Sequence, residues 1–266
     1  MGREENIAVF DDTMAWFKTS KKLSGAISGS IDGTKLYTVD EMPKPTEKRY
    51  TETKIAVTKS RSFEAAFRLR QTYPDMKIGV HNFASAVHPG GGVAKGSTAQ
   101  EEALCRCSTL YPVLNTGYLR RNYYDINKKQ MDPANTDAII YTPDILIIKT
   151  DTKEPQRIGS EKWVTVDVLT AAAPDLRRCI IDDENLFRLH AQRARKILAV
   201  ASDRAIDVLV LGAFGCGAFK NDPLIVAKAY KEVLPEFNGC FKEIEFAVFC
   251  SSYDTGNYTA FCNTLS

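Results

Sequence analysis

Long hydrophobic runs are missing from this 266-residue sequence. The longest apolar stretches, such as residues 208–214, are far shorter than the roughly 20 residues that a helix needs to cross a bilayer. No apolar stretch follows the charged start at residues 1–6, so the sequence predicts no secretory signal. We therefore expect no membrane contact and a cytoplasmic protein, or a nuclear one if its source is eukaryotic.

An excess of charge of one sign is also missing. The 35 Lys and Arg residues nearly balance 33 Asp and Glu residues, which gives a net charge of +2. Proteins that bind nucleic acid normally carry a strong basic bias, so we expect no direct, sequence-specific contact with nucleic acid. A phosphate-bearing ligand is not excluded, because loops and helix ends hold phosphates without any basic patch.

Paired thiols are the third absence. None of the seven cysteines has Cys-x-x-Cys spacing, and the three histidines (His81, His88 and His190) lie far from any paired thiols in the sequence. This pattern argues against a zinc site, and nothing else in the sequence calls for a metal or a cofactor. We interpret the cysteines as buried free thiols in a reducing compartment.

Strands and helices alternate along most of the chain. Hydrophobic periodicity predicts strands over residues 35–39, 54–58, 76–83, 144–149, 163–169, 206–212 and 243–250. It predicts helices over residues 7–20, 62–71, 98–110, 183–203, 223–235 and 258–265. Residues 25–33 have the composition of a turn-rich connector, and residues 115–136 show no clear period.

This alternation indicates an α/β fold, with helices on both faces of a mostly parallel sheet. No internal repeat and no linker long or polar enough to divide two domains is found. We therefore predict a single domain over residues 1–266, with residues 1–50 as an N-terminal helical extension packed on it.

Two glycine-rich loops each follow a buried strand and lead into a helix. The first covers residues 88–102 and the second residues 212–223. In open α/β sheets ligands bind at the carboxyl ends of strands, and glycines let consecutive backbone N–H groups approach phosphate oxygens. Known nucleotide motifs fail, because Ser97 replaces the lysine of a P-loop and neither G-x-G-x-x-G nor G-x-S-x-G is present. A phosphate-bearing ligand of another kind is favoured.

Three polar side chains, Gln100, Glu101 and Glu102, occupy the first turn of the helix that follows the first loop. Favourable interaction with the helix dipole could explain two carboxylates there. Their position beside a predicted phosphate site favours a functional role. Adjacent helical residues point about 100° apart, so the two carboxylates can serve different parts of one ligand.

This combination resembles a known family. Gly90-Gly91-Gly92, seven residues and then Gln100-Glu101-Glu102 is similar to the signature of poly(ADP-ribose) glycohydrolases. Residues 82–86, 168–174 and 212–223 resemble the microbial branch of that family, and the likeness spans residues 54–250. It implies a macrodomain-like fold, a three-layer α/β/α arrangement around a mixed sheet.

The resemblance also assigns roles to residues. It implies that Glu102 is the catalytic acid and base and that Glu101 holds the ribose hydroxyls. Asn82 would orient a ribose, although Ser85 stands where many macrodomains have a second asparagine. The remaining predicted substrate-binding residues are Gln100, then Gly90, Gly91, Gly92 and Val93 around the diphosphate and the reacting ribose, and Gly215, Cys216, Gly217, Ala218 and Phe219 closing over the diphosphate. Phe214, at a strand end, fits a core position equally well.

The implied reaction is hydrolysis of the ribose–ribose O-glycosidic bonds of poly(ADP-ribose), releasing ADP-ribose. Such a bond breaks through an oxocarbenium-like state, and one carboxyl group can donate a proton first and accept one later. No cofactor or metal is needed. The expected partners are poly(ADP-ribose), ADP-ribose and ADP-ribosylated proteins, so the protein would reverse ADP-ribosylation, including that made in a DNA damage response.

Two other functions stay open at this point. The chain could be a reader that binds ADP-ribose without hydrolysis, although a reader has no need of the Gln-Glu-Glu run. It could also remove mono(ADP-ribose) from a protein or nucleic acid, or phosphate from ADP-ribose 1″-phosphate. The preference for exo or endo cleavage, the oligomeric state and the role of residues 115–136 are likewise open.

Overall fold

The computed structural model describes residues 2–44 and 46–266, so residues 1 and 45 of the predicted N-terminal extension lie outside it. Its strands are β1 (Lys35–Tyr37), β2 (Lys54–Thr58), β3 (Ile78–Phe83), β4 (Ile139–Ile147), β5 (Val164–Ala171), β6 (Val208–Leu211) and β7 (Glu243–Ala247). Its α-helices are α1 (Arg3–Thr19), α2 (Lys21–Gly33), α3 (Ser62–Thr72), α4 (Gln100–Cys107), α5 (Leu110–Leu114), α6 (Gly117–Leu119), α7 (Asp125–Gln130), α8 (Asp183–Asp203), α9 (Pro223–Val233) and α10 (Gly256–Leu265). In these described ranges, no helix combines the length and the apolar character that a membrane span requires.

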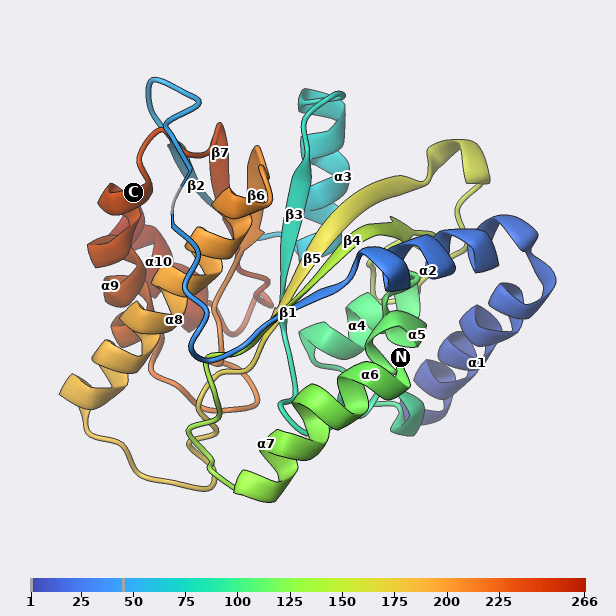
Figure 1. Ribbon diagram of the computed structural model, residues 1–266, viewed down its shortest axis with the longest axis horizontal. Helices are drawn as coiled ribbons and strands as arrows, with labels where there is room; N and C mark the ends of the chain where they lie inside the picture. Colours follow the sequence, from blue (N-terminus) through green and yellow to red (C-terminus); the bar gives the residue numbers. More distant parts are fainter. Residues whose placement is uncertain (1, 45) are drawn as a thin grey trace.

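One seven-stranded sheet, in the order β1-β4-β5-β3-β6-β7-β2, forms the centre of the molecule (Figure 1). The pairings of β5 with β3, β3 with β6, β6 with β7 and β7 with β2 are parallel. At the other edge, β4 runs antiparallel to both β1 and β5. The predicted α/β fold with a mixed, mostly parallel sheet is confirmed.

A hydrophobic core lies on each face of the sheet. Along β6, Val208 and Val210 point into one core, and Leu209 and Leu211 point into the other. This alternation follows from the two-residue period of a strand, and it makes a strand buried on both faces wholly apolar. Figure 1 shows α8, α9 and α10 gathered on one side and the helices α1 to α7 on the other. The result is the three-layer arrangement.

The N-terminal extension contains a helix that the sequence does not predict. Residues 25–33, which we expect to be a connector, belong to α2. The side chain of Ser20 caps this helix by accepting a hydrogen bond from the Leu23 N–H (3.3 Å), and Leu23 is fully buried against Phe17 and Ile148. Gly25 and Gly29 face open space, so they cost helix propensity but no packing. Burial of one apolar face outweighs that cost.

The predicted helix over residues 98–110 is broken in two. After α4, Ser108 pairs with Ile147 at the edge of β4, and the backbone N–H of Thr109 donates to the carbonyl of Leu146 (3.0 Å). The Thr109 hydroxyl also accepts from the Leu146 N–H (3.0 Å). These bonds to β4 replace helical ones, so the helix ends at Cys107 and a new one begins at Leu110.

Two further differences have local causes. β4 begins at Ile139 rather than at residue 144, and its register shifts between Thr142 and Ile145, where Pro143 and a left-handed Asp144 (φ 55°) interrupt the alternation. Residues 115–136 form the short helices α6 and α7 with the π-helical turn η2 (Arg120–Tyr124) between them. These three segments follow one another without a gap over residues 117–130, and the π-helical turn in the middle shifts the 3.6-residue period, so the sequence shows no single helical period.

Candidate active site

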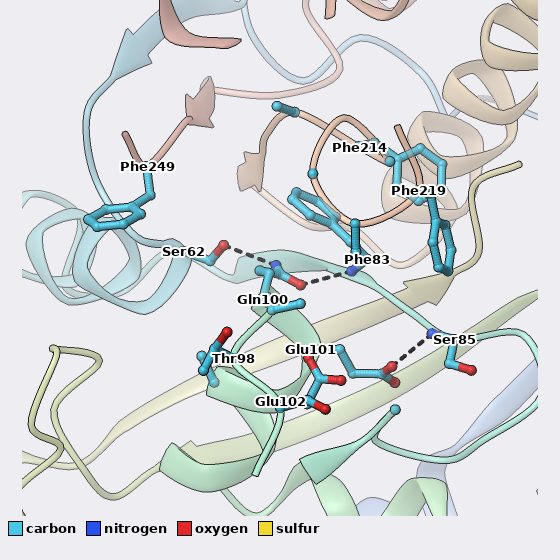
Figure 2. A pocket seen from close by; sticks show the side chains of 18 of the residues that line it. Ser62, Phe83, Ser85, Thr98, Gln100, Glu101, Glu102, Phe214, Phe219 and Phe249 are labelled. Carbon is cyan, nitrogen blue, oxygen red and sulfur yellow. Dashed lines mark hydrogen bonds between the residues drawn. The ribbon is translucent and has the colours of Figure 1, made fainter. Parts of the chain in front are cut away.

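The two glycine loops meet over one cavity of about 1100 Å³ at the carboxyl ends of the central parallel strands. Figure 2 shows Glu101 and Glu102 on one side of this cavity, with the rings of Phe83, Phe214 and Phe219 across from them. Phe249 lies apart from these rings, near Ser62. The structure thus brings together the glycine loops and the acidic pair that the sequence singles out.

The first loop requires glycine both for its backbone conformation and because there is no room for a side chain. Gly90, Gly91 and Gly96 have φ angles of 67°, 58° and 76°, in the left-handed region where a Cβ atom is unfavourable. A Cβ atom at Gly91 would also lie 2.4 Å from Oε1 of Glu102. The loop therefore lies directly against the Glu102 carboxylate.

Glu102 is held at the floor of the cavity by one of its two oxygens. Its side chain is 7% exposed, and its Oε1 accepts a hydrogen bond of 2.8 Å from the backbone N–H of Gly92. Its Oε2 is buried and has no hydrogen-bond partner within the described residues. This oxygen is therefore free to bind a group that enters the cavity.

Glu101, one position earlier, is held more fully. Its Oε2 accepts from the backbone N–H of Ser85 (2.7 Å), and its Oε1 accepts from the Asn82 side chain (3.4 Å). Burial raises the pKa of Glu101 to about 8, against the lowering effect of the Ser85 hydrogen bond and with the help of the Glu102 charge. At neutral pH, the acidic pair therefore holds a proton.

Two predicted binding residues support the pair instead of facing the cavity freely. Asn82 is fully buried and also donates to the Thr170 hydroxyl (3.1 Å). Gln100 lines the cavity, but its Oε1 accepts from the Phe83 N–H (2.9 Å) and its amide nitrogen donates to the Ser62 hydroxyl and the His81 carbonyl. The Gln100 side chain thus joins α4 to the end of β3 and the start of α3.

The remaining predicted residues divide between the lining and the layer beneath it. Six of them, namely Gly91, Gly92, Gly215, Gly217, Ala218 and Phe219, line the cavity. Among the described residues, four predicted ones lie outside that lining, namely Asn82, Gly90, Val93 and Cys216. Val93 is 1% exposed and packs in the core on the α4 side of the sheet, so only its backbone is available to a ligand through the loop.

The second loop is fixed by a buried clasp. Asn221 is 2% exposed, and its amide nitrogen donates to the carbonyls of Pro174 (2.8 Å) and Gly215 (3.1 Å). Its Oδ1 lies 2.8 Å from Nε2 of the buried His190, which therefore carries its proton on Nε2. Within the described residues, the backbone N–H groups of residues 217–219 donate no hydrogen bond. Three consecutive free N–H groups at a cavity are suited to phosphate oxygens.

The first loop is different in this respect. The N–H groups of Gly91 and Val93 donate to the carbonyls of His88 (2.9 Å) and Gly90 (3.1 Å), and that of Gly92 is used by Glu102. Two of these three donors stabilise the loop itself, and the third binds Glu102. Of the two loops, the second is therefore the one with three consecutive free N–H groups at residues 217–219.

Several lining residues were not predicted as site residues from the sequence, among them Arg61, Phe83, Arg177 and Phe249. The guanidinium groups of Arg61 and Arg177 lie over the rings of Phe249 (4.0 Å) and Phe219 (5.1 Å). Phe83 and Phe249 each follow a run of buried strand residues. Their place at the carboxyl end of a strand is the sequence feature that could have identified them as lining residues. Phe214 is 1% exposed between the rings of His81 and His190, so it is a core residue that also lines the cavity.

Gly217→Val should weaken ADP-ribose binding by at least about tenfold without unfolding the protein. A Cβ atom at Gly217 meets nothing within 4 Å, so the new side chain fits the free protein and occupies only ligand space. Gly215 is the opposite case, because its φ is 78° and a Cβ atom there would lie 2.6 Å from that of Ala173. Calorimetric titration with ADP-ribose tests this, and unchanged affinity in the folded Gly217→Val variant would show that the loop is only a turn.

The family model for the catalytic domain of microbial-type poly(ADP-ribose) glycohydrolase matches residues 10–150, slightly over half of the chain. The chain belongs to this family. Three solved structures are similar over nearly its whole length. The poly(ADP-ribose) glycohydrolase of Thermomonospora curvata is 30% identical, with a TM-score of 0.88 and coverage of 99% of this chain and 100% of that one.

The same Thermomonospora curvata enzyme bound to the inhibitor ADP-HPD is 31% identical, with a TM-score of 0.86 and coverage of 98% and 99%. The glycohydrolase of Deinococcus radiodurans in complex with ADP-ribose is 32% identical, with a TM-score of 0.79 and coverage of 90% and 96%. Among curated proteins, none matches the chain. The predicted family, macrodomain-like fold and glycosidase class are confirmed.

Proposed function

We propose that this poly(ADP-ribose) glycohydrolase cleaves the ribose–ribose bond through Glu102, acting first as an acid and then as a base. The observation that carries the proposal is the difference in hydrogen bonding between the two oxygens of the Glu102 carboxyl group. Oε1 is fixed by the Gly92 N–H, and Oε2 is buried without a partner among the described residues. An oxygen with unused hydrogen-bonding capacity beside a cavity is suited to a reacting oxygen of the substrate.

The chemistry uses one proton in two directions. Protonated Glu102 gives its proton to the ribose oxygen that leaves, the bond from the anomeric carbon to that oxygen breaks, and an oxocarbenium-like state forms. Water then attacks the anomeric carbon, and the Glu102 carboxylate takes the proton that the water loses. The products are ADP-ribose and a polymer shorter by one unit, and Glu102 is protonated again.

Glu101 has a supporting role in this proposal. It holds the ribose hydroxyls, and its burial supports that role because a carboxyl group with a pKa of about 8 stays protonated at neutral pH and can donate a hydrogen bond. A neutral Glu101 also places no negative charge of its own beside the ligand. Asn82 and the Ser85 N–H fix its orientation.

The diphosphate is assigned to the second loop. The free N–H groups of residues 217–219 support this placement, and the Phe219 ring beside them would pack on the distal ribose. No group of three or more His, Cys, Asp or Glu side chains in the described part of the chain is arranged to hold a metal ion. Independence from metals remains a prediction, and so does a cytoplasmic location, which rests on the free cysteines.

Product analysis on defined substrates tests the proposed reaction. We expect ADP-ribose to be released from poly(ADP-ribose) in the presence of a chelator, with little release from a mono(ADP-ribosyl)ated peptide. ADP-ribose should also raise the melting temperature, because it binds only the native state. Release from the mono-modified peptide alone would assign the chain to the alternative hydrolase, and binding without any release would make it a reader.

A further inference from the structure

The N-terminal helix α1 packs against the end of the first glycine loop (Figure 1). Three consecutive loop carbonyls each accept a hydrogen bond from a side chain. Nε of Arg3 donates to Lys95 (2.8 Å), the amide nitrogen of Asn6 donates to Gly96 (3.2 Å), and Nη1 of Arg106 donates to Ser97 (2.6 Å). Two of these three donors come from α1, about 90 residues away in the sequence.

The contact is close and shaped for glycine. Asn6 is 2% exposed, so its amide is part of the interior rather than the surface. A Cβ atom at Gly96 would lie 2.3 Å from the carbonyl oxygen of Arg3, and Gly96 has a φ of 76°. The absence of a side chain at Gly96 is therefore what lets α1 approach the loop.

This end of the loop is connected to Glu102 by short steps. The N–H groups of Lys95 and Ser97 donate to the carbonyl of Gly92, at 2.9 and 3.2 Å. The N–H of the same Gly92 donates to Oε1 of Glu102. Gly96 lies between Lys95 and Ser97, and both of these bind the Gly92 carbonyl. A displacement at Gly96 is therefore passed on to the Glu102 carboxylate through Gly92.

Helix α1 also holds the helix that carries Glu102. Thr13 is fully buried, and its hydroxyl donates to the backbone carbonyl of Arg106 on α4 (2.7 Å). The ring of Phe10 packs edge-on against that of Tyr111, with 4.9 Å between ring centroids. The helix thus touches both segments whose relative position sets the Gly92–Glu102 hydrogen bond.

We propose that α1 is a buttress for the first glycine loop and that Asn6 is a positioning residue for Glu102. The proposal rests on the catalytic role of Glu102 given above. Asn6 has no contact with the substrate in this proposal, and it acts by holding the Gly96 carbonyl. Loss of that bond leaves a buried carbonyl unsatisfied and lets the loop move relative to the carboxylate. Small misplacements of catalytic groups are costly in rate.

The test compares Asn6→Ala with Phe17→Leu in the full chain. Both change a buried side chain of α1, but Phe17 packs with Leu23 and Ile148, away from the loop. We expect Asn6→Ala to lower kcat per folded molecule by about tenfold or more, with a smaller change in KM. Phe17→Leu should lower the melting temperature and leave kcat unchanged. Equal losses of kcat in the two variants would overturn the proposal, because they would show a general effect on stability.

Hydrogen exchange of the peptide over residues 90–99 gives a second readout that does not depend on catalysis. Asn6→Ala should speed exchange there, and Phe17→Leu should not. If Asn6→Ala does not fold, Arg3→Ala carries the same test at an exposed position, and unchanged exchange in that variant overturns the buttress. If exchange rises but Glu102→Gln remains active, the catalytic assignment fails while the contact between α1 and the loop stands.

Discussion

Glu102→Gln should lose about 10²–10⁴-fold of its turnover of poly(ADP-ribose), the usual cost of removing a general acid and base. Glutamine keeps the size of the side chain, and its amide oxygen can still accept the hydrogen bond from the Gly92 N–H that Oε1 accepts now. It cannot donate a proton to the leaving oxygen and take one back. ADP-ribose should bind with unchanged or higher affinity, because the amide keeps the hydrogen bond to the Gly92 N–H and cannot place a negative charge near the diphosphate.

Glu101→Gln is the matched comparison, one residue earlier on the same helix. It should impair binding more than Glu102→Gln does, because its role is to hold the ribose, and its loss of turnover should follow from misplacement. Release of ADP-ribose from polymer and calorimetric affinity for ADP-ribose are measured on both variants, with folding checked by circular dichroism. Wild-type turnover in Glu102→Gln would remove the catalytic assignment, whatever the family membership.

The glycine loops could be found from the sequence because glycine is required there by geometry. Gly91 and Gly215 both have positive φ angles, and both lie against side chains that leave no room for a Cβ atom. Such positions accept only glycine readily, so the loops can be recognised from the glycines in the local sequence. The loops' place at strand ends then follows from the alternation of strands and helices, which the sheet confirms.

The hydrogen bonds between the residues of the site could not be predicted in the same way. That Asn82 holds Glu101, and that Gln100 binds the Phe83 N–H, depends on which strand lies beside α4. The clasp between Asn221 and His190 joins residues 31 apart in the sequence. Amide and imidazole groups make similar bonds with many partners, so their identity does not reveal which partner the fold provides.

The error at residues 25–33 has the same origin. Glycine and serine are poor helix formers in isolation, and the sequence there predicts a connector. The gain from burying Leu23 and Ile27 comes from Phe17 on α1 and Ile148 beyond β4, which only the tertiary structure places nearby. Packing of this kind supplies most of the stability of a protein helix, and it is not visible in a local window.

The contribution of Glu101 to the stability of the protein should fall as pH rises from about 5 to about 8. The pKa of Glu101 is raised to about 8 from an ordinary value of 4.5 by burial. Between these two values the folded chain holds a proton that the unfolded chain has released. The contribution is therefore fully present below pH 4.5 and is lost as pH rises through about 8, with a slope approaching about 1.4 kcal/mol per pH unit.

Glu101→Gln removes this titration and leaves the others in place. Asp151, whose pKa burial raises to about 6, and the buried His81 and His190 titrate in both proteins, so their effects cancel in the difference. Urea unfolding of the two proteins at pH 5, 6, 7 and 8 gives that difference. The free energy of unfolding of Glu101→Gln should increase relative to that of the wild type at each step to higher pH. Glu232→Gln, at an exposed position on α9, is the control substitution, and its free energy of unfolding should run parallel to that of the wild type. A difference between Glu101→Gln and the wild type that does not change with pH would mean that Glu101 is already ionised in the folded protein at pH 5.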